Sequence, residues 1–362
     1  MGENYSFTVN GVMRSTSEDK PLLRYLREDL HLHSVKDGCS EGACGTCTVI
    51  VDGKATRACI PMVSKMEGKK ILTVEGLSQR EKDVYGYAFA KAGAVQCGFC
   101  IPGMVMCAKA LLDVNPAPDR LEVIAAIRNN VCRCTGYKKI IEAILLSARI
   151  LREGLPVEEE QGKVPVGMAM QRIDAREKVL GTGEYPDDVY LDGMIYASAV
   201  RSKYPRARVL AIHTKKARGL QGVVGVFTAN DIPGDIKVGH LKQDWDALIP
   251  VGGMTHYLGD AICLVAAESM EVLEEAKSLV EVDYEVQEGV FDPFEALKEG
   301  APKVHESGNI LAHEHLIRGD AGQAIAGAKY KVTNHYETPW TEHAFLEPET
   351  AVAMPFDDGV FI

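Results

Sequence analysis

The chain has 362 residues, 46% hydrophobic and 25% charged, which is enough to bury several cores and predicts two or three domains. Its net charge of −11 comes from acidic residues spread along the chain, and no basic stripe alternates with aromatic residues, which argues against nucleic acid as a partner. No apolar run approaches the ~18 residues of a membrane span, and the N-terminal MGENYSFTVNG lacks the pattern of a signal peptide. We therefore expect a cytoplasmic protein that does not bind membranes.

The first segment is predicted to be a compact α+β domain, residues 1–78. Asn10-Gly11 and Asp52-Gly53 are hairpin signals, and leucines recur at helical spacing over residues 22–30. Strands are predicted at residues 5–9, 13–16, 48–51 and 71–74. A small sheet with one helix packed on it should result.

The next segment, residues 79–153, is predicted to be a bundle of four short helices. They are expected at residues 81–92, 103–113, 119–130 and 137–152. The stretch EGLPVEEEQGKVPV that follows is charged, carries two prolines and lacks periodicity, so residues 154–177 are interpreted as a linker.

Residues 178–290 alternate between β-rich and helical patterns and are predicted to be a second α/β domain. Strands are expected at residues 194–200, 209–213, 223–228, 261–267 and 280–284, with a helix at 269–279. Residues 305–362 would begin a further sheet, with strands at 330–338 and 350–354. The chain ends on a turn, residues 357–359, followed by an apolar strand without a visible partner, so we expect this last domain to be incomplete.

Ten cysteines in a chain without a secretion signal argue for metal ligation rather than disulfides, because the cytosol keeps thiols reduced. Eight of them form two sets before residue 135. The first set is Cys39, Cys44, Cys47 and Cys59, with the spacing of plant-type 2Fe–2S ferredoxins. Glycines between these cysteines let the backbone wrap closely around a cluster. Zinc is the alternative, but zinc sites usually pair their ligands in two short knuckles, whereas this set has three ligands in one loop and a distant fourth.

The second set is Cys97, Cys100, Cys132 and Cys134. Taken alone, a Cys-x2-Cys with a distant Cys-x-Cys could also hold zinc or act as a redox dithiol. Each pair lies next to a predicted helix start, where helix amides stabilise thiolates, and this placement favours a buried cluster between two helix ends.

The remaining candidate residues are interpreted as structural. Cys107 and Cys263 lie in apolar segments and should be small core residues. His343 and Glu347 have the i,i+4 spacing of a helical metal site, but flanking prolines argue against a helix there. Gly181-Thr182-Gly183 lacks the rest of a dinucleotide fingerprint. No catalytic residue is assigned.

CSEGACGTC with Cys59, then QCGFCIPGM, then CRCTGY, closely resembles the iron–sulfur portion of the molybdenum hydroxylases, the family of xanthine dehydrogenases and aldehyde oxidoreductases. KVLGTGEYPDD, AVRSKYPRA and HYLGDAICLVAAE resemble its hammerhead domain, and TEHAFLEPE resembles the opening of its molybdenum-binding domain. The resemblance implies a multidomain α+β fold: a ferredoxin-like β-grasp domain, a four-helix 2Fe–2S bundle, an α/β hammerhead domain and a truncated α+β molybdenum-binding domain.

The resemblance also implies a role for each cysteine set. The first would hold a solvent-side 2Fe–2S cluster and the second a cluster nearer to molybdenum, while Gln96 matches the family's contact to the pterin of the molybdenum cofactor. A plain helix-capping role is the alternative for Gln96. No FAD domain follows the bundle, so electrons would leave to a separate flavin subunit or a ferredoxin-like carrier. The family's catalytic glutamate lies beyond residue 362, so molybdopterin chemistry would need the chain to be completed or partnered.

The leading hypothesis is the N-terminal electron-transfer part of a flavin-free molybdenum hydroxylase acting on a purine-like heterocycle, with an aldehyde as the alternative substrate. Two other hypotheses are a standalone iron–sulfur subunit that docks a catalytic chain, and a zinc-stabilised interaction protein. The sequence does not identify the substrate or the electron acceptor, and it leaves the oligomeric state open, a homodimer included.

Overall fold

The computed structural model describes residues 4–157, 166–167, 170–240 and 242–362. Contacts divide the chain into two compact units, Met1–Val189 with Glu337–Ile362 as unit 1 and Tyr190–Tyr336 as unit 2. Across these described ranges, none of the helices combines the length and the apolar character that crossing a membrane would require.

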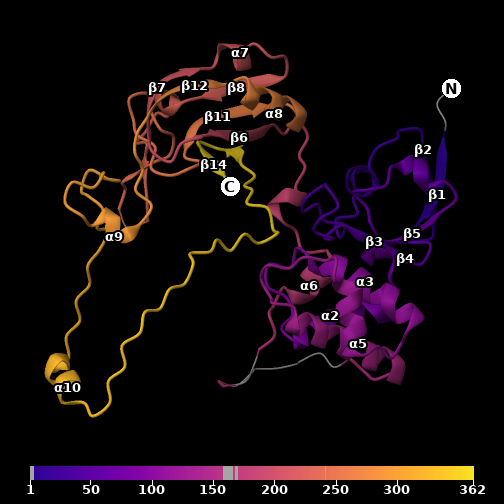
Figure 1. The fold of residues 1–362 in the computed structure, drawn as a ribbon. Coiled ribbons are helices and arrows are strands. Elements are labelled where there is room, and N and C mark those ends of the chain that lie inside the picture. The colour runs from indigo at the N-terminus through magenta and orange to yellow at the C-terminus, as the bar shows by residue number, and fades with distance from the viewer. Residues whose placement is uncertain (1–3, 158–165, 168–169, 241) are drawn as a thin grey trace. The chain divides into compact units, whose positions relative to one another are not determined.

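The N-terminal part of unit 1 is a five-stranded sheet (Figure 1). Its strands are β1 (Tyr5–Val9), β2 (Val12–Thr16), β3 (Thr48–Val51), β4 (Lys54–Arg57) and β5 (Lys70–Leu72), in the order β2-β1-β5-β3-β4. β1 is parallel to β5, and the other pairs are antiparallel. Asn10-Gly11 and Asp52-Gly53 form both hairpin turns with positive φ throughout, as a type I′ turn needs, which confirms the two predicted hairpins.

One short helical segment covers this sheet. Helix α1 (Leu22–Arg24) continues as a π-helical turn over Tyr25–Asp29, and 3₁₀ turns follow at Val63–Met66 and Val74–Gly76. Leu22, Leu23 and Leu26 are buried against Phe7 and Val49. Each such side chain removed from water contributes roughly 1.5–3 kcal/mol, so this apolar face holds the helix on the sheet.

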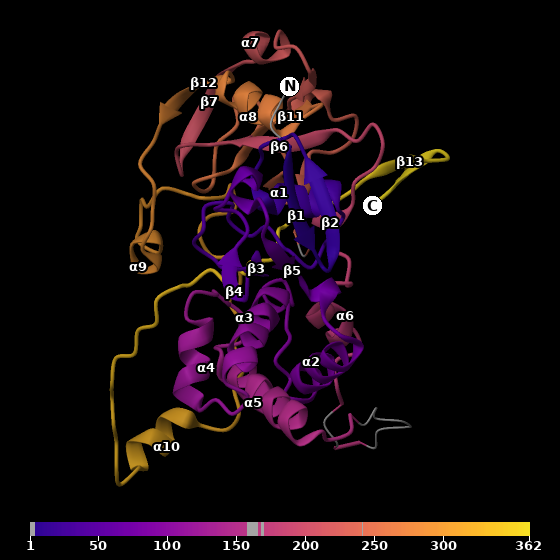
Figure 2. The same ribbon diagram turned by 90° about the vertical axis from the view of Figure 1, so that its right-hand side faces the viewer.

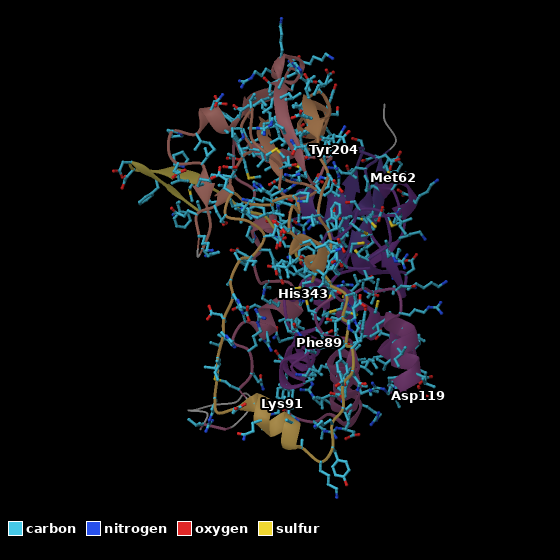
Figure 3. All side chains as sticks on the ribbon, turned by 60° about the vertical axis from the view of Figure 1, so that its left-hand side comes forward. Met62, Phe89, Lys91, Asp119, Tyr204 and His343 are labelled. Atoms are coloured by element: carbon cyan, nitrogen blue, oxygen red, sulfur yellow. The ribbon has the colours of Figure 1, made fainter. Side chains whose placement is uncertain are left out.

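Four helices follow in unit 1, and Figure 2 shows them below the sheet. They are α2 (Gln79–Lys91), α3 (Ile101–Val114), α4 (Arg120–Ile127) and α5 (Lys138–Glu153), close to the predicted bounds. Ser78 and Asp119 begin α2 and α4 as capping boxes with a glutamate three residues on. Asp119 and the fully buried Phe89 of α2 are labelled in Figure 3.

The predicted linker, residues 154–177, lies partly outside the described residues, and its last residues begin a helix that packs within unit 1. Helix α6 (Ala175–Leu180) contacts α2 and α3, and a 3₁₀ turn follows at Pro186–Asp188. Residues 178–189, which were predicted to begin the second α/β domain, are grouped by their contacts with the first compact unit. Buried Ala175 and Val179 explain the packing, since both lie in the apolar core of the helical bundle.

Unit 2 contains two main antiparallel sheets, and its short strands β9 (Lys237–Val238) and β10 (Trp245–Asp246) pair as a third. One has the order β6-β11-β8, formed by β6 (Tyr196–Arg201), β11 (Ala261–Ala267) and β8 (Val223–Phe227), and the other pairs β7 (Ala207–His213) with β12 (Glu281–Val286). Helices α7 (Lys215–Arg218) and α8 (Met270–Ser278) contact each other, and α8 contacts the first sheet. The shorter elements are β9 (Lys237–Val238), β10 (Trp245–Asp246), a 3₁₀ turn Ala229–Asp231, α9 (Pro293–Ala296) and α10 (Ala321–Gly327). The predicted α/β alternation is confirmed here.

The C-terminal segment differs from the prediction. Residues 330–338 pair with no strand in the described part of the chain, so the strand predicted there was wrong. The only sheet in the last forty described residues is the hairpin of β13 (Met354–Phe356) and β14 (Gly359–Phe361). The final apolar strand therefore does have a partner, because Asp357 with its positive φ lets the chain fold back on itself.

Candidate iron–sulfur sites

The structure brings the first four cysteines together as two pairs. Cys39 interacts with Cys44, whose backbone N–H donates to the Cys39 Sγ at 3.4 Å, and the thiol of Cys47 interacts with that of Cys59. Cys44 and Cys47 are buried, and Cys39 and Cys59 are half-buried. Residues 39–47 therefore carry three of the four thiols, and Cys59, which follows β4, supplies the fourth.

The environment of this set favours thiolates at its exposed edge. Burial opposes ionisation of Cys39, but backbone N–H groups of Cys44, Glu41 and Ala43 donate to its sulfur and lower its pKa. Burial raises the pKa of Cys44, and it raises that of Cys47 to about 12. A thiolate that ligates a metal accepts hydrogen bonds from backbone N–H groups, so these contacts suit a metal-binding thiolate.

The second set is likewise two pairs, but from two distant segments. The thiol of Cys97 contacts that of Cys134, and the thiol of Cys100 contacts that of Cys132. Cys100 is the N-cap residue of α3, so Cys97 and Cys100 lie at a helix N-terminus, as predicted. The backbone N–H of Cys132 donates to the Tyr137 hydroxyl at 2.9 Å. This hydrogen bond holds the segment of Cys132 and Cys134 against the start of α5.

One thiol of the second set ionises most easily. A hydrogen bond with the Cys100 thiol, helped by the Thr135 hydroxyl 3.1 Å from its Sγ, lowers the pKa of Cys132 to about 5. The same contact with Cys132 raises the pKa of Cys100 well above its usual value, and burial raises that of Cys97 to about 11. Four thiols crowded in one site repel one another as thiolates, so a bound cation is the partner that would stabilise all four.

The pairing tests which metal centre the thiols fit. A structural zinc gathers three or four ligands around one ion, whereas a 2Fe–2S cluster takes two cysteines on each of its two irons. In the residues that the structure describes, no three His, Cys, Asp or Glu side chains gather as a single ion requires. Both sets are instead two pairs of thiols, the arrangement that a two-iron cluster needs, so the residues present fit 2Fe–2S clusters.

Direct hydrogen bonds join the two sites. The backbone N–H of Val131 donates to the carbonyl of Cys44 at 2.8 Å, and Val131 precedes Cys132 of the second set. The Asn130 side chain, which is buried, donates to the carbonyl of Gly45 at 2.9 Å. Gly45 has φ +74, and a Cβ there would lie 2.3 Å from the carbonyl oxygen of Asn129, so glycine permits this close approach.

Gln96 lies next to the second set with an exposed side chain. Its backbone carbonyl accepts a hydrogen bond from Arg172 Nη1 at 2.6 Å. The N-terminus of α3 carries no side-chain cap, so the structure shows no capping role for this glutamine.

Three features of the second site have no local signal in the sequence. Lys178 and Tyr185 both donate to the carbonyl of Cys97, at 3.0 and 2.8 Å. Arg133, between Cys132 and Cys134, donates to the carbonyls of His343 and Glu342 at 2.7 and 3.1 Å. Figure 3 labels His343 on its extended segment. These partners lie 81 to 210 residues apart in the chain, so periodicity and spacing do not reveal them.

The leftover candidates are not members of either cysteine set. Cys107 is buried and donates through Sγ to Asn130 Oδ1 at 3.1 Å, and burial raises its pKa to about 11. Cys263 is buried in the core of unit 2. His343 and Glu347 lie in a segment without helix, so the spacing that suggested a metal site has no helical meaning there.

Three family models match the chain. They are a 2Fe–2S iron–sulfur cluster binding domain over residues 18–84, a 2Fe–2S binding domain over residues 73–145, and the hammerhead domain of aldehyde oxidase and xanthine dehydrogenase over residues 180–288.

Relatives agree with these matches. The chain is 33% identical to the aldehyde oxidoreductase of Megalodesulfovibrio gigas over 97% of this chain and 41% of the relative. It is 47% identical to the nicotinate dehydrogenase small FeS subunit of Eubacterium barkeri over 38% of this chain and 90% of that subunit. The solved aldehyde oxidoreductase from Desulfovibrio gigas superposes with a TM-score of 0.79 at 31% identity, covering 91% of this chain and 39% of that one.

The chain is a multidomain α/β protein with two 2Fe–2S binding domains and a hammerhead domain. It belongs to the molybdenum hydroxylase family, which includes the aldehyde oxidoreductases and the xanthine dehydrogenases. It spans about two fifths of the length of the aldehyde oxidoreductases that it matches.

Proposed function

We propose that this chain is the electron-transfer part of a flavin-free molybdenum hydroxylase, an oxidoreductase that oxidises an aldehyde or an N-heterocycle. Cys39, Cys44, Cys47 and Cys59 would hold the first cluster, and Cys97, Cys100, Cys132 and Cys134 the second. Each cluster would supply a carrier for single electrons. Electrons would leave to a separate flavin subunit or a ferredoxin-like carrier in the cytoplasm.

The observation that carries this proposal is the hydrogen bond between the two cysteine sets. The Cys44 carbonyl accepts from the Val131 amide, so a ligand of one site is linked to the neighbour of a ligand of the other. Buried Asn130 and the close approach at Gly45 hold this contact rigidly. Two clusters fixed at short separation suit a relay, and nothing in such an arrangement is needed for a protein that only binds zinc.

The order of the two sites follows from their surroundings. Arg133, within the second set, holds the backbone of residues 342–343, which lie in the segment that resembles the opening of a molybdenum-binding domain. The first set has the half-buried Cys39 and Cys59 at its edge. We infer that the second cluster lies on the molybdenum side and that the first faces the acceptor, with the exposed Gln96 side chain available to the pterin.

The substrate is proposed from the relatives. Aldehyde oxidoreductase matches nearly the whole chain, so an aldehyde is the first substrate to assay, and a heterocycle such as a purine or nicotinate is the second. A standalone iron–sulfur subunit is the alternative, and it would co-purify with a larger molybdenum-bearing chain.

The test is metal and sulfide analysis of protein purified without oxygen, combined with electron paramagnetic resonance. The expected result is equal iron and acid-labile sulfide, no zinc, and two distinct signals on reduction. Colourless protein that contains zinc and no labile sulfide would contradict the proposal. Turnover of aldehydes or heterocycles by the complete molybdenum-loaded protein would then identify the substrate class.

A further inference from the structure

Residues 172–188, which we call the strap, run along the second cysteine site within unit 1. The strap contains α6 and the 3₁₀ turn Pro186–Asp188, and α6 packs on α2 and α3.

The strap donates three hydrogen bonds to two consecutive carbonyls beside the second site. Arg172 donates to the carbonyl of Gln96, and Lys178 Nζ and Tyr185 Oη donate to the carbonyl of the ligand Cys97. The Lys178 ammonium also lies 4.3 Å from the centre of the Tyr185 ring. Only 13% of the Lys178 side chain is exposed, whereas its ion-pair partner Asp174, 3.9 Å away, is 40% exposed. Water therefore screens the charge of Asp174 more than that of Lys178.

The loop at Cys97 leaves no spare room against the strap. Gly98 has φ +88, and a Cβ there would lie 2.7 Å from Lys178 Cβ and 2.9 Å from Tyr185 Oη. Gly181 of the strap has φ +72, and its Cβ would lie 2.4 Å from the Cα of Ser34 in the first domain. These two close approaches fix the distance between the strap's donors and the cysteine loop.

A buried ion network holds the far end of the strap. Asp188 pairs with Lys36 and with Arg27, which lies 3.0 Å away, and all three side chains are at most 5% exposed. The Lys36 ammonium lies 4.6 Å from the centre of the Tyr185 ring and 5.8 Å from that of Phe99. Phe99 lies between Cys97 and Cys100, so the network contacts both Tyr185 and the cysteine loop.

We propose that Lys178 and Tyr185 are positioning residues that raise the reduction potential of the second cluster relative to the first. A cluster becomes more negative when it accepts an electron, so a positive charge and a hydroxyl donor at the peptide of its ligand stabilise the reduced state. At the first site, the carbonyls of Cys44 and Cys47 accept hydrogen bonds from the backbone N–H groups of Val131 and Ala58 instead. This inference rests on the proposed assignment of the second set as cluster ligands.

The test is a redox titration of the full chain followed by electron paramagnetic resonance, with variants at both positions. Lys178→Met removes the charge and keeps the length, and Tyr185→Phe removes only the hydroxyl. Lys178→Met should lower the reduction potential of the second cluster by about 59 mV, which for a one-electron couple is a tenfold change. The electron would then favour the first cluster about tenfold more than in the unmodified chain. Tyr185→Phe should shift this preference about threefold in the same direction.

Two further variants separate electrostatics from packing. Lys178→Arg keeps the charge and should restore most of the potential. Tyr85→Phe is the matched control, because Tyr85 is fully buried in the same bundle and its hydroxyl has no partner in the described part of the chain. It should move neither potential.

The outcomes distinguish this inference from the proposed function. If both resonance signals are present and neither Lys178→Met nor Tyr185→Phe changes a reduction potential, the strap only supports the fold. That result would overturn this inference and leave the proposed function intact. A shift of both clusters by the same amount would also overturn it. Absence of a second signal from the unmodified chain would overturn the proposed function, and this inference with it.

Discussion

The two cysteine sites are built in different ways. The first takes three of its ligands from a single loop, residues 39–47, whose backbone amides donate to the Cys39 sulfur. The second joins residues 97–100 to residues 132–134, and contacts from the strap and from Arg133 surround it. The comparison suggests that changes remote in sequence will disturb the second site, whereas the first depends mainly on its own loop.

Loss of a ligand in the first loop gives the largest expected effect. Cys44→Ser should abolish the first cluster and electron transfer to external acceptors, because a serine hydroxyl is a poor substitute for a thiolate on iron. The Cys44 carbonyl that contacts Val131 is backbone, so the second cluster should remain reducible. Resonance signals and iron content measure both effects.

Cys263→Ser provides the control for this substitution, since Cys263 is buried in unit 2 and contacts no other cysteine there. It should keep both signals. Equal loss of the two signals in Cys44→Ser would contradict the separate assignment of the sites.

Removal of the buried carboxylate of the strap gives the next largest effect. Asp188→Asn leaves the Lys36 and Arg27 cations buried without a carboxylate, which should lower the free energy of unfolding by about 3–5 kcal/mol. Chemical denaturation at neutral pH measures this. Because the strap contacts the second site, the resonance signal of the second cluster should broaden while that of the first cluster stays sharp.

Asp187→Asn is the neighbouring control. Burial raises the pKa of the Asp187 carboxyl above 3.8, so its charge disfavours the folded state at neutral pH, and its loss should not lower stability. As pH falls through the raised folded-state pKa toward 3.8, the folded chain binds more protons than the unfolded chain, so the wild type gains stability relative to this variant. Equal losses in the two variants at pH 7 would disprove the role of Asp188.

Substitution at the contact between the sites should have an intermediate effect. Gly45→Ala places a Cβ 2.3 Å from the Asn129 carbonyl, on a residue with φ +74. Gly53 has a similar positive φ, +80, but the Cβ that Gly53→Ala adds would meet nothing within 4 Å. Both variants should lose about 1–2 kcal/mol from the left-handed conformation, and Gly45→Ala about 1–3 kcal/mol more from the clash.

Thermal unfolding of the two glycine variants side by side measures the difference. A slower electron exchange between the clusters in Gly45→Ala, and not in Gly53→Ala, would sharpen the claim that this contact sets their separation. Equal midpoints would mean that the loops are not pressed together.

The smallest effect is expected at Cys107. Cys107→Ala should keep both clusters, because its thiol contacts Asn130 and is not part of either set. Loss of the hydrogen bond and of the buried sulfur should cost about 1 kcal/mol. Spectra and unfolding midpoints check this, and bleaching of either cluster would show that a ligand was misassigned.

Much of the fold could be predicted because its signals are local. Asn10-Gly11 and Asp52-Gly53 determine two hairpins by the conformations that these residues adopt, and Ser78 and Asp119 determine two helix starts by capping. The strand predicted at residues 330–338 failed for the opposite reason. An alternating pattern needs a partner strand, and none pairs with it in the described chain.

The candidate sites divide in the same way. The spacing of Cys39, Cys44 and Cys47, with glycines between them, identified the first set without any structure, because one loop carries most of its ligands. The sequence also grouped Cys97, Cys100, Cys132 and Cys134, but only the structure shows which thiols lie together as pairs.

By itself, then, the sequence determined the local turns and the helices, since each depends on residues close together in the chain, and it grouped eight cysteines into two candidate sets. Only the tertiary structure decided that Lys178 and Tyr185 meet the carbonyl of Cys97 and that Asp188 neutralises Lys36. These pairs are 81 to 152 residues apart, and their side chains meet only because burial of the apolar faces of the sheet and helices brings their segments together.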